Sequence, residues 1–239
     1  MNMNNKQEYL NPRCDRSNLD SFLIRNGILK ALEAVLPSFI GKVLDVGCGF
    51  KPYRSIVLSS DCKADEYIGL DFSDGLYGAP DLAWDGLSIP LAEHSIDTAM
   101  ATEVLEHCPD PGAVLKEICR VLKPGGVFFF TVPFLWPLHD MPHDYYRYTP
   151  RGLEELLLKN GFSGIEVFPL GGWDASLAQI LGLWVSRRPM PVPVRTVLQT
   201  LLWPVYRLLL YVDKKNEVLG SDTIFPGLYG VARKQEAEV

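Results

Sequence analysis

The sequence has little cysteine, no excess of basic charge and no secretory signal. The net charge of −6 and the pI of about 5.3 give no hint of a basic face for a phosphate backbone, so we do not expect nucleic acid as a substrate. The first ten residues, MNMNNKQEYL, show no charged-then-apolar signal segment, which predicts a cytoplasmic protein. A cytosolic location also suits the five cysteines, which form no C-x-x-C pair: Cys14, Cys48, Cys62, Cys108 and Cys119.

A glycine turn between 42 and 53, KVLDVGCGFKPY, organises the rest of the chain. Apolar residues up to position 46 predict a short buried strand, and Gly47 and Gly49 then turn the chain into a helix start near Pro52. Glycines let the backbone approach a ligand, and the following helix N-terminus offers free N–H groups. The dinucleotide pattern G-x-G-x-x-G has Pro52 at its third glycine, which argues against NAD. Asp45, two residues before the turn, favours a ligand with a cationic amino-acid end.

Further motifs follow in a fixed order. EYIGLD ends a second strand at Asp71, about 25 residues after Asp45, where a carboxylate accepts from both ribose hydroxyls in nucleotide-binding α/β folds. DGLSIPL at 85–91, SIDTAM at 95–100, LEH at 105–107 and LKPGG at 122–126 come next. Together these segments closely resemble the class I S-adenosylmethionine-dependent methyltransferases of the small-molecule branch, over about 43–168.

The resemblance implies a role for each cofactor-binding residue. Asp45, Gly47, Cys48 and Gly49 would surround the methionine part, Asp71 would hold the ribose, and Glu103 would lie beside the methionine end. Asp85 would accept from the adenine amino group, with Phe72 and Gly86 flanking the base. Asp85 as a turn cap, and Glu103, Glu106 and His107 as a polar loop after a buried strand, are the alternatives.

Strands that alternate with helices predict an α/β, Rossmann-like fold with a seven-stranded, mainly parallel sheet and helices on both faces. We expect strands near 43–46, 67–70, 81–83, 96–101, 126–132, 162–168 and 227–233. Helices are expected at 17–36, 111–122 and 150–158, with a helical insert between strands six and seven. The segments are an N-terminal arm and helix (1–37), the methyltransferase core (38–169), the insert (170–222), and the last strand and tail (223–239).

The loop after the fifth strand, residues 133–150, is our candidate acceptor site because it is rich in aromatic, histidine and ionisable residues. Methyl transfer depends mainly on in-line placement, but a hydroxyl acceptor also needs a general base. His143 is the first candidate and His139 the second, with Asp144 orienting the imidazole. HDYYRYT at 143–149 resembles segments of bacterial methyltransferases from polysaccharide clusters.

The same loop has other interpretations. His139 and His143 are four residues apart, which invites a metal site, but Pro142 argues against a regular helix through them, and we predict no metal. Asp144 and Arg147 are equally well read as a structural ion pair. The tyrosines of the loop suit either packing or a ring-bearing acceptor.

The insert carries two apolar helical stretches at 175–185 and 194–212. Arg195, Gln199, Pro204 and Arg207 make the second stretch a poor membrane span. Three roles remain open: a cap over the acceptor site, a homodimer face, or a peripheral contact of 175–215 with the inner face of the membrane. In the third role, aromatic anchors would act with basic residues: Trp203, Tyr206 and Tyr211 with Arg187, Arg188, Lys214 and Lys215.

The function implied is methyl transfer from S-adenosylmethionine to a small-molecule or lipid-linked glycan acceptor, at oxygen. Asn/Asp-Pro-Pro-Tyr motifs of amino-group methylators are absent at 102–105, where the chain reads TEVL. Carbon methylation of a quinone-like or lipid acceptor, a non-catalytic cofactor-binding scaffold, and a nucleotide-dependent oxidoreductase are the alternatives.

Overall fold

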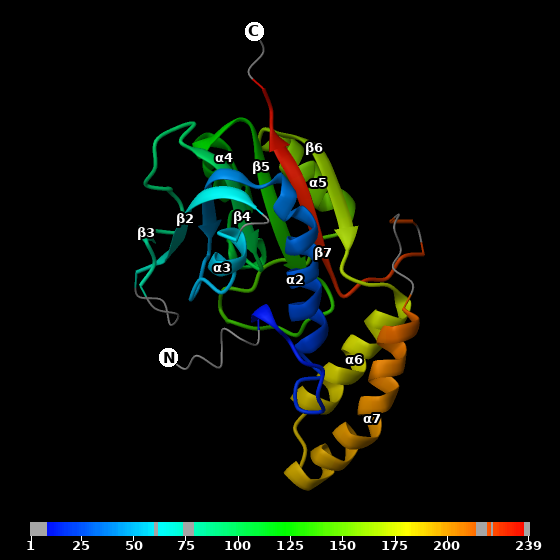
Figure 1. Cartoon of the computed structure of the whole chain (residues 1–239). Coiled ribbons are helices and arrows are strands. Elements are labelled where there is room, and N and C mark those ends of the chain that lie inside the picture. The colour runs from blue at the N-terminus through cyan, green and yellow to red at the C-terminus, as the bar shows by residue number, and fades with distance from the viewer. Residues whose placement is uncertain (1–8, 60–61, 74–78, 214–218, 221, 237–239) are drawn as a thin grey trace. The chain divides into compact units, whose positions relative to one another are not determined.

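The computed structural model describes residues 9–59, 62–73, 79–213, 219–220 and 222–236. Within them lies a seven-stranded sheet in the order β3-β2-β1-β4-β5-β7-β6 (Figure 1). The pairs β1–β2, β2–β3, β1–β4 and β4–β5 are parallel, and the arrow of β7 points opposite to that of β6. The strands are β1 (Ile40–Val46), β2 (Lys63–Phe72), β3 (Leu82–Trp84), β4 (Ile96–Thr102), β5 (Leu122–Pro133), β6 (Phe162–Pro169) and β7 (Gly227–Lys234).

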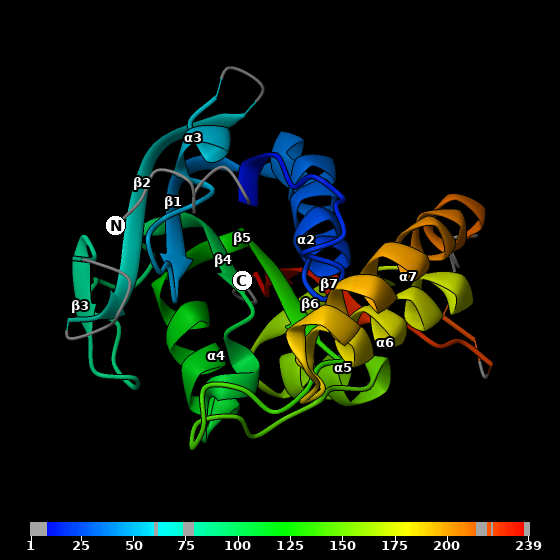
Figure 2. The same cartoon turned by 90° about the horizontal axis from the view of Figure 1, so that it is seen from below.

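The helices with both ends in the described residues are α2 (Phe22–Val35), α3 (Arg54–Val57), α4 (Pro111–Val121), α5 (Pro150–Lys159), α6 (Trp173–Arg187) and α7 (Val192–Val212). Two 3₁₀ turns add η1 (Leu36–Ser38) and η2 (Leu105–His107). Asp110 caps α4 by accepting from the Ala113 amide, and Thr149 caps α5 by accepting from the Gly152 amide. α4 and α5 lie on one face of the sheet and α3 on the other (Figure 2). The predicted fold class, including the helical insert between β6 and β7, is confirmed.

The centre of the sheet is apolar on both faces, as expected for parallel strands covered on both sides. β1 buries Val43, Leu44 and Val46, and β4 buries the run 99–101. β5 adds three consecutive buried phenylalanines, 128–130. This rigid centre fixes where the strands end at their carboxyl edge, and the polar residues follow at that edge.

The chain divides into two compact units. One comprises Leu32–Val132, Leu138–Val167 and Tyr229–Val239 and holds most of the sheet. The other comprises Met1–Ala31, Pro133–Pro137 and Phe168–Leu228 and holds α6 and α7, which pack side by side in both views (Figures 1 and 2).

The second unit is held together by polar contacts at both ends of α6. Asp213, just after α7, accepts from the amides of Gly172 and Ala175 and so caps the N-terminus of α6. At the other end, Arg187 Nε donates to Asp20 Oδ2 at 2.6 Å. The insert therefore folds as one piece with the N-terminal segment.

Three element boundaries differ from the sequence prediction. The first helix begins at Phe22 rather than at Ser17, because the Ser21 and Phe22 amides bond to the Asn18 carbonyl in a turn. β2 begins at Lys63, where its polar residues pair with β1. The helix after the glycine turn is a single turn, α3.

The proposed aromatic anchors of the insert differ in exposure. Tyr211 is 87% exposed, but Tyr206 is buried, so the prediction that Tyr206 is an interface anchor is wrong. Trp203 is half-buried and lies with its Nε1 3.4 Å from the Cys14 carbonyl oxygen. Lys214 and Lys215 lie outside the described residues. In the described parts of the chain, no helix combines the length and the apolar character that a membrane span requires.

Candidate functional site

The glycine turn lies at the carboxyl end of β1, between the ends of β2 and β4. Gly47 and Gly49 have φ of 67° and 51°, in the left-handed region that glycine adopts at little cost. The Gly47 and Cys48 amides donate to the Leu70 carbonyl of β2. A Cβ on Gly47 would come within 2.5 Å of Val104 Cγ2, so the turn packs directly on the loop after β4.

Asp71, the predicted ribose acceptor, lies at the end of β2 beside the turn. Its Oδ2 accepts from the Gly49 amide at 2.7 Å, and its Oδ1 accepts from the Phe72 amide at 2.8 Å. The carboxylate therefore supports the turn, and its remaining lone pairs are available to a ligand.

Two further residues brace the turn in a way that the sequence motifs did not indicate. Lys51 Nζ lies 2.5 Å from Asp81 Oδ1, and Asp81 Oδ2 accepts from the Gly69 amide.

Cys48 is buried, and burial raises the pKa of its thiol to about 12. The thiol is therefore protonated at neutral pH and is a small packing group rather than a nucleophile.

Asp45 is buried inside the sheet and accepts a hydrogen bond from the Tyr67 hydroxyl. Burial raises its pKa to about 7, against the opposing effect of the Tyr67 hydrogen bond. Its Oδ1 has no hydrogen-bonding partner among the described residues. Asp45 Oδ1 is therefore a buried hydrogen-bond acceptor two residues before the turn.

The residues predicted to hold the base gather at the ends of β2 and β3. The Phe72 and Trp84 rings stack with centroids 5.6 Å apart, and Gly86 packs against the Phe72 ring. Asp85 Oδ1 accepts from the Leu87 and Ser88 amides at 2.8 and 2.7 Å, as in the turn-cap alternative. Only one carboxylate oxygen is used in this cap, so the other can still serve the predicted adenine contact.

Glu103 follows β4 with a φ of 55°, an uncommon conformation for a residue other than glycine. The Thr131 hydroxyl of β5 donates to Glu103 Oε1 at 2.8 Å, and the Glu103 amide donates to the Thr131 carbonyl. Burial raises the pKa of Glu103 to about 7. The next residue in the chain, Val104, is the one whose side chain packs on the glycine turn.

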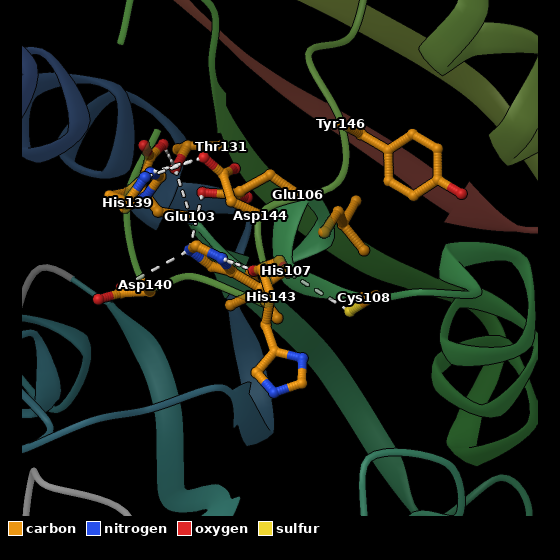
Figure 3. A network of polar contacts seen from close by, with 12 residues as sticks. Glu103, Glu106, His107, Cys108, Thr131, His139, Asp140, His143, Asp144 and Tyr146 are labelled. Carbon is orange, nitrogen blue, oxygen red and sulfur yellow. Dashed lines mark hydrogen bonds and ion pairs between the residues drawn. The ribbon is translucent and has the colours of Figure 1, made fainter. Parts of the chain in front are cut away.

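Glu106 and His107, in η2, belong to one network of ionisable side chains with Glu103, His139 and Asp144 (Figure 3). Glu106 is fully buried, and neither carboxylate oxygen has a hydrogen-bonding partner among the described residues. Burial raises its pKa well above the ordinary value, and the negative charge of Glu103 raises it further. His107 Nδ1 lies 2.5 Å from the His143 carbonyl oxygen, and its Nε2 lies 3.7 Å from Glu106 Oε1.

His139 and Asp144 reach this cluster from the loop after β5. His139 Nδ1 lies 3.3 Å from Asp144 Oδ2, and the His139 and His107 ring centroids are 4.7 Å apart. Arg147 donates to both oxygens of Asp144, at 2.6 and 2.9 Å, and holds the pKa of this carboxyl far below its usual range. The structural ion pair that the sequence suggested is therefore present.

His143 is separate from the other histidines. Its side chain is exposed and points away from the cluster in Figure 3, with Nδ1 3.1 Å from the Tyr145 hydroxyl. Asp144 thus faces His139 and not His143. The sequence predicts Glu106 and His107 as part of a polar loop after β4, and its only signal for more is that two ionisable residues stand side by side there.

Comparisons with known proteins agree with the sequence motifs. Residues 44–130 match the family described as "Methyltransferase domain". The chain is 34% identical over 128 residues to sterol 24-C-methyltransferase erg6 of Aspergillus fumigatus, over 47% of this chain and 33% of that protein. It is 32% identical over 131 residues to ubiquinone biosynthesis O-methyltransferase of Methylococcus capsulatus, over 44% of this chain and 54% of that protein.

The matches therefore span about a third and about half of these two relatives. Among solved structures, a SAM-dependent methyltransferase from Thermotoga maritima has a TM-score of 0.57 at 16% identity, over 97% of this chain and 95% of that one. At this identity the likeness concerns the fold.

Proposed function

We propose that the chain, whose residues 44–130 match the methyltransferase domain family, transfers a methyl group from S-adenosylmethionine to an oxygen atom of its acceptor. The observation that carries the proposal is the junction of the Gly47–Gly49 turn, Asp71 and the loop after β4. There the carboxylates of Asp71 and Glu103 lie at one carboxyl edge of the sheet, beside a glycine turn that carries no side chain to keep a ligand away.

Calorimetric titration with S-adenosylmethionine, S-adenosylhomocysteine and NADH tests the cofactor. Micromolar binding of the first two, without binding of NADH, is the expected result. If NADH alone binds, the oxidoreductase alternative replaces the proposal.

We propose a small-molecule or lipid-linked glycan as the acceptor, in a site formed by the loop after β5. Its exposed tyrosines, Tyr145 and Tyr146, offer ring faces with polar tips, which suit a sugar or another ring. A transfer assay with tritiated S-adenosylmethionine would compare polyprenyl-diphosphate-linked N-acetylglucosamine with a simple catechol. Label recovered on carbon would favour the carbon-methylation alternative, and cofactor binding without transfer to either acceptor would favour the scaffold.

His143 is proposed as the general base because it is the exposed histidine of this loop, with the Tyr145 hydroxyl beside its Nδ1. His143→Ala is expected to lower kcat by about 100-fold or more, while leaving the Kd for S-adenosylmethionine within about twofold. Added imidazole should restore part of the rate. Full activity in the variant would remove His143 from this role.

A membrane-bound acceptor is supported by two exposed apolar stripes on the insert helices. On α7, residues 194, 197, 201, 205, 208 and 212 follow helical spacing, and each is exposed. On α6 the exposed residues at the same spacing are 173, 177, 180 and 184, ending in Trp184. The sequence of α7 contains two arginines and no acidic residue, which suits an anionic lipid surface. We therefore propose peripheral membrane contact through this face, with the homodimer and cap as the competing roles.

Sedimentation with vesicles tests this contact. Binding to vesicles containing phosphatidylglycerol is expected to exceed binding to pure phosphatidylcholine by about tenfold, and Leu201→Glu with Leu208→Glu should abolish it. If both substitutions leave vesicle binding unchanged, another surface is responsible. If the wild-type protein ignores vesicles but sediments as a dimer that the substitutions dissociate, the stripe is a dimer face.

A further inference from the structure

The sheet-bearing unit contains a cluster of ionisable side chains that has no role in the methyl-transfer proposal. Glu106, His107 and His139 each place one potential ligand atom within 4.8 Å of the other two. Glu106 and His107 come from η2 and His139 comes from the loop after β5, 32 residues later in the chain. Figure 3 shows their side chains turned toward one another.

Glu106 supplies an independent observation that a ligand belongs here. Its side chain is fully buried, yet neither oxygen has a hydrogen-bonding partner among the described residues. Buried carboxylates are normally paired or coordinate a metal, since an isolated one is very costly. A bound cation would give the Glu106 oxygens the partner that the described residues do not provide.

The two histidines are oriented as metal ligands usually are. His107 Nδ1 donates to the His143 carbonyl, which leaves the lone pair on Nε2, the nitrogen that faces Glu106. His139 Nδ1 faces Asp144, which Arg147 fixes in turn. Metal-binding histidines commonly use one nitrogen for the metal and give the other to a carbonyl or carboxylate. His107 has this arrangement through the His143 carbonyl, and His139 has a carboxylate oxygen 3.3 Å from its Nδ1.

We propose that Glu106, His107 and His139 bind one divalent transition-metal ion, for which zinc is the best match. Two imidazoles and one carboxylate suit zinc, and three protein ligands leave a position open. This donor set differs from the pair of His139 and His143 that the sequence spacing suggests. The His143 side chain lies outside the set, and the His143 backbone carbonyl accepts from His107 Nδ1.

The open position would matter for the reaction. If the proposed methyl transfer is correct, an acceptor hydroxyl bound there would lose its proton more easily, because a cation stabilises the oxyanion. This consequence rests on the proposed function. Metal binding itself does not, so the two proposals can fail separately.

The experiment measures metal binding without cofactor or acceptor. Chelator-treated full-length protein is titrated with cobalt(II), followed by visible absorption, and with zinc in competition with a chromophoric chelator. We expect one equivalent to bind, with roughly 100-fold weaker binding or more in His107→Ala, His139→Ala and Glu106→Gln. Glu106→Gln keeps the side-chain shape and serves if an alanine variant fails to fold.

His143→Ala is the matched control, since its side chain lies in the same loop but outside the donor set. It should bind cobalt and zinc as the wild type does. The proposal is overturned if the wild-type protein binds no stoichiometric metal. It is equally overturned if folded Glu106→Gln binds as tightly as the wild type, or if His143→Ala loses the metal as His107→Ala does.

Discussion

Asp71→Ala is expected to bind S-adenosylmethionine and S-adenosylhomocysteine roughly 30- to 1000-fold more weakly than the wild-type protein. The substitution removes the proposed acceptor of two ribose hydrogen bonds, worth on the order of 2–4 kcal/mol for a charged acceptor. It also removes the 2.7 Å hydrogen bond from the Gly49 amide to Asp71 Oδ2, which helps to hold the glycine turn in place. Calorimetric titration of both ligands measures the change.

Asp65→Ala is the matched control for Asp71→Ala, because Asp65 lies on the same strand, β2, with an exposed side chain. It removes the same charge from the same strand and should leave both affinities within about twofold. Circular dichroism would show that both variants remain folded. Equal affinity in Asp71→Ala and the wild-type protein would mean that the cofactor pocket is misplaced.

The strands of the sheet were predictable because their signal is local. Continuous apolar runs such as 128–130 can only be buried between two covered faces, and the Gly47–Gly49 turn marks where β1 ends. The start of β2 was missed because Lys63, Asp65 and Glu66 are polar, and their strand conformation comes from pairing with β1 rather than from apolar alternation. The N-terminal helix begins later than predicted because the Ser21 and Phe22 amides donate to the Asn18 carbonyl in a turn before it.

The candidate site was predictable only in part. Residues that end strands, such as Asp71 and Glu103, could be placed because parallel strands end at one edge of the sheet. Which imidazole meets Asp144 could not, because His139 and His143 are both within its reach along the chain. The choice depends on how the loop folds back so that the His143 carbonyl meets His107, a contact across 36 residues. The sequence predicts that α6 and α7 are apolar helices. It does not predict which apolar side chains are exposed, because that depends on which face of each helix packs inward.

Asp144→Ala is expected to lower the free energy of unfolding by about 3 kcal/mol. The Asp144 carboxylate has no exposed surface, accepts both terminal nitrogens of Arg147, and also accepts from the His139 amide. Removing it leaves the guanidinium without its charged partner in a half-buried place, which costs more than the pair itself contributes. Urea unfolding followed by tryptophan fluorescence measures the loss.

The chain offers a matched control for Asp144→Ala in the exposed pair of Arg151 and Glu154. This pair has the same i,i+3 spacing and a distance of 2.7 Å, but the arginine is 88% exposed. Because exposed ion pairs contribute little, Glu154→Ala should change the unfolding free energy by no more than about 0.5 kcal/mol. Similar losses in both variants would show that burial does not distinguish Asp144.

The loss in Asp144→Ala should also depend on pH in a defined direction. Arg147 holds the pKa of Asp144 below its ordinary value of 3.8, so folding favours the ionised carboxylate. Its contribution to stability is then fully present above about pH 4 and is lost as the pH falls through the lower, folded-state pKa. The difference between wild type and Asp144→Ala should therefore stay constant from about pH 5 to 8 and shrink in more acidic solution. A difference that instead shrank as the pH rose toward 8 would mean that the Arg147 pairing is not its source.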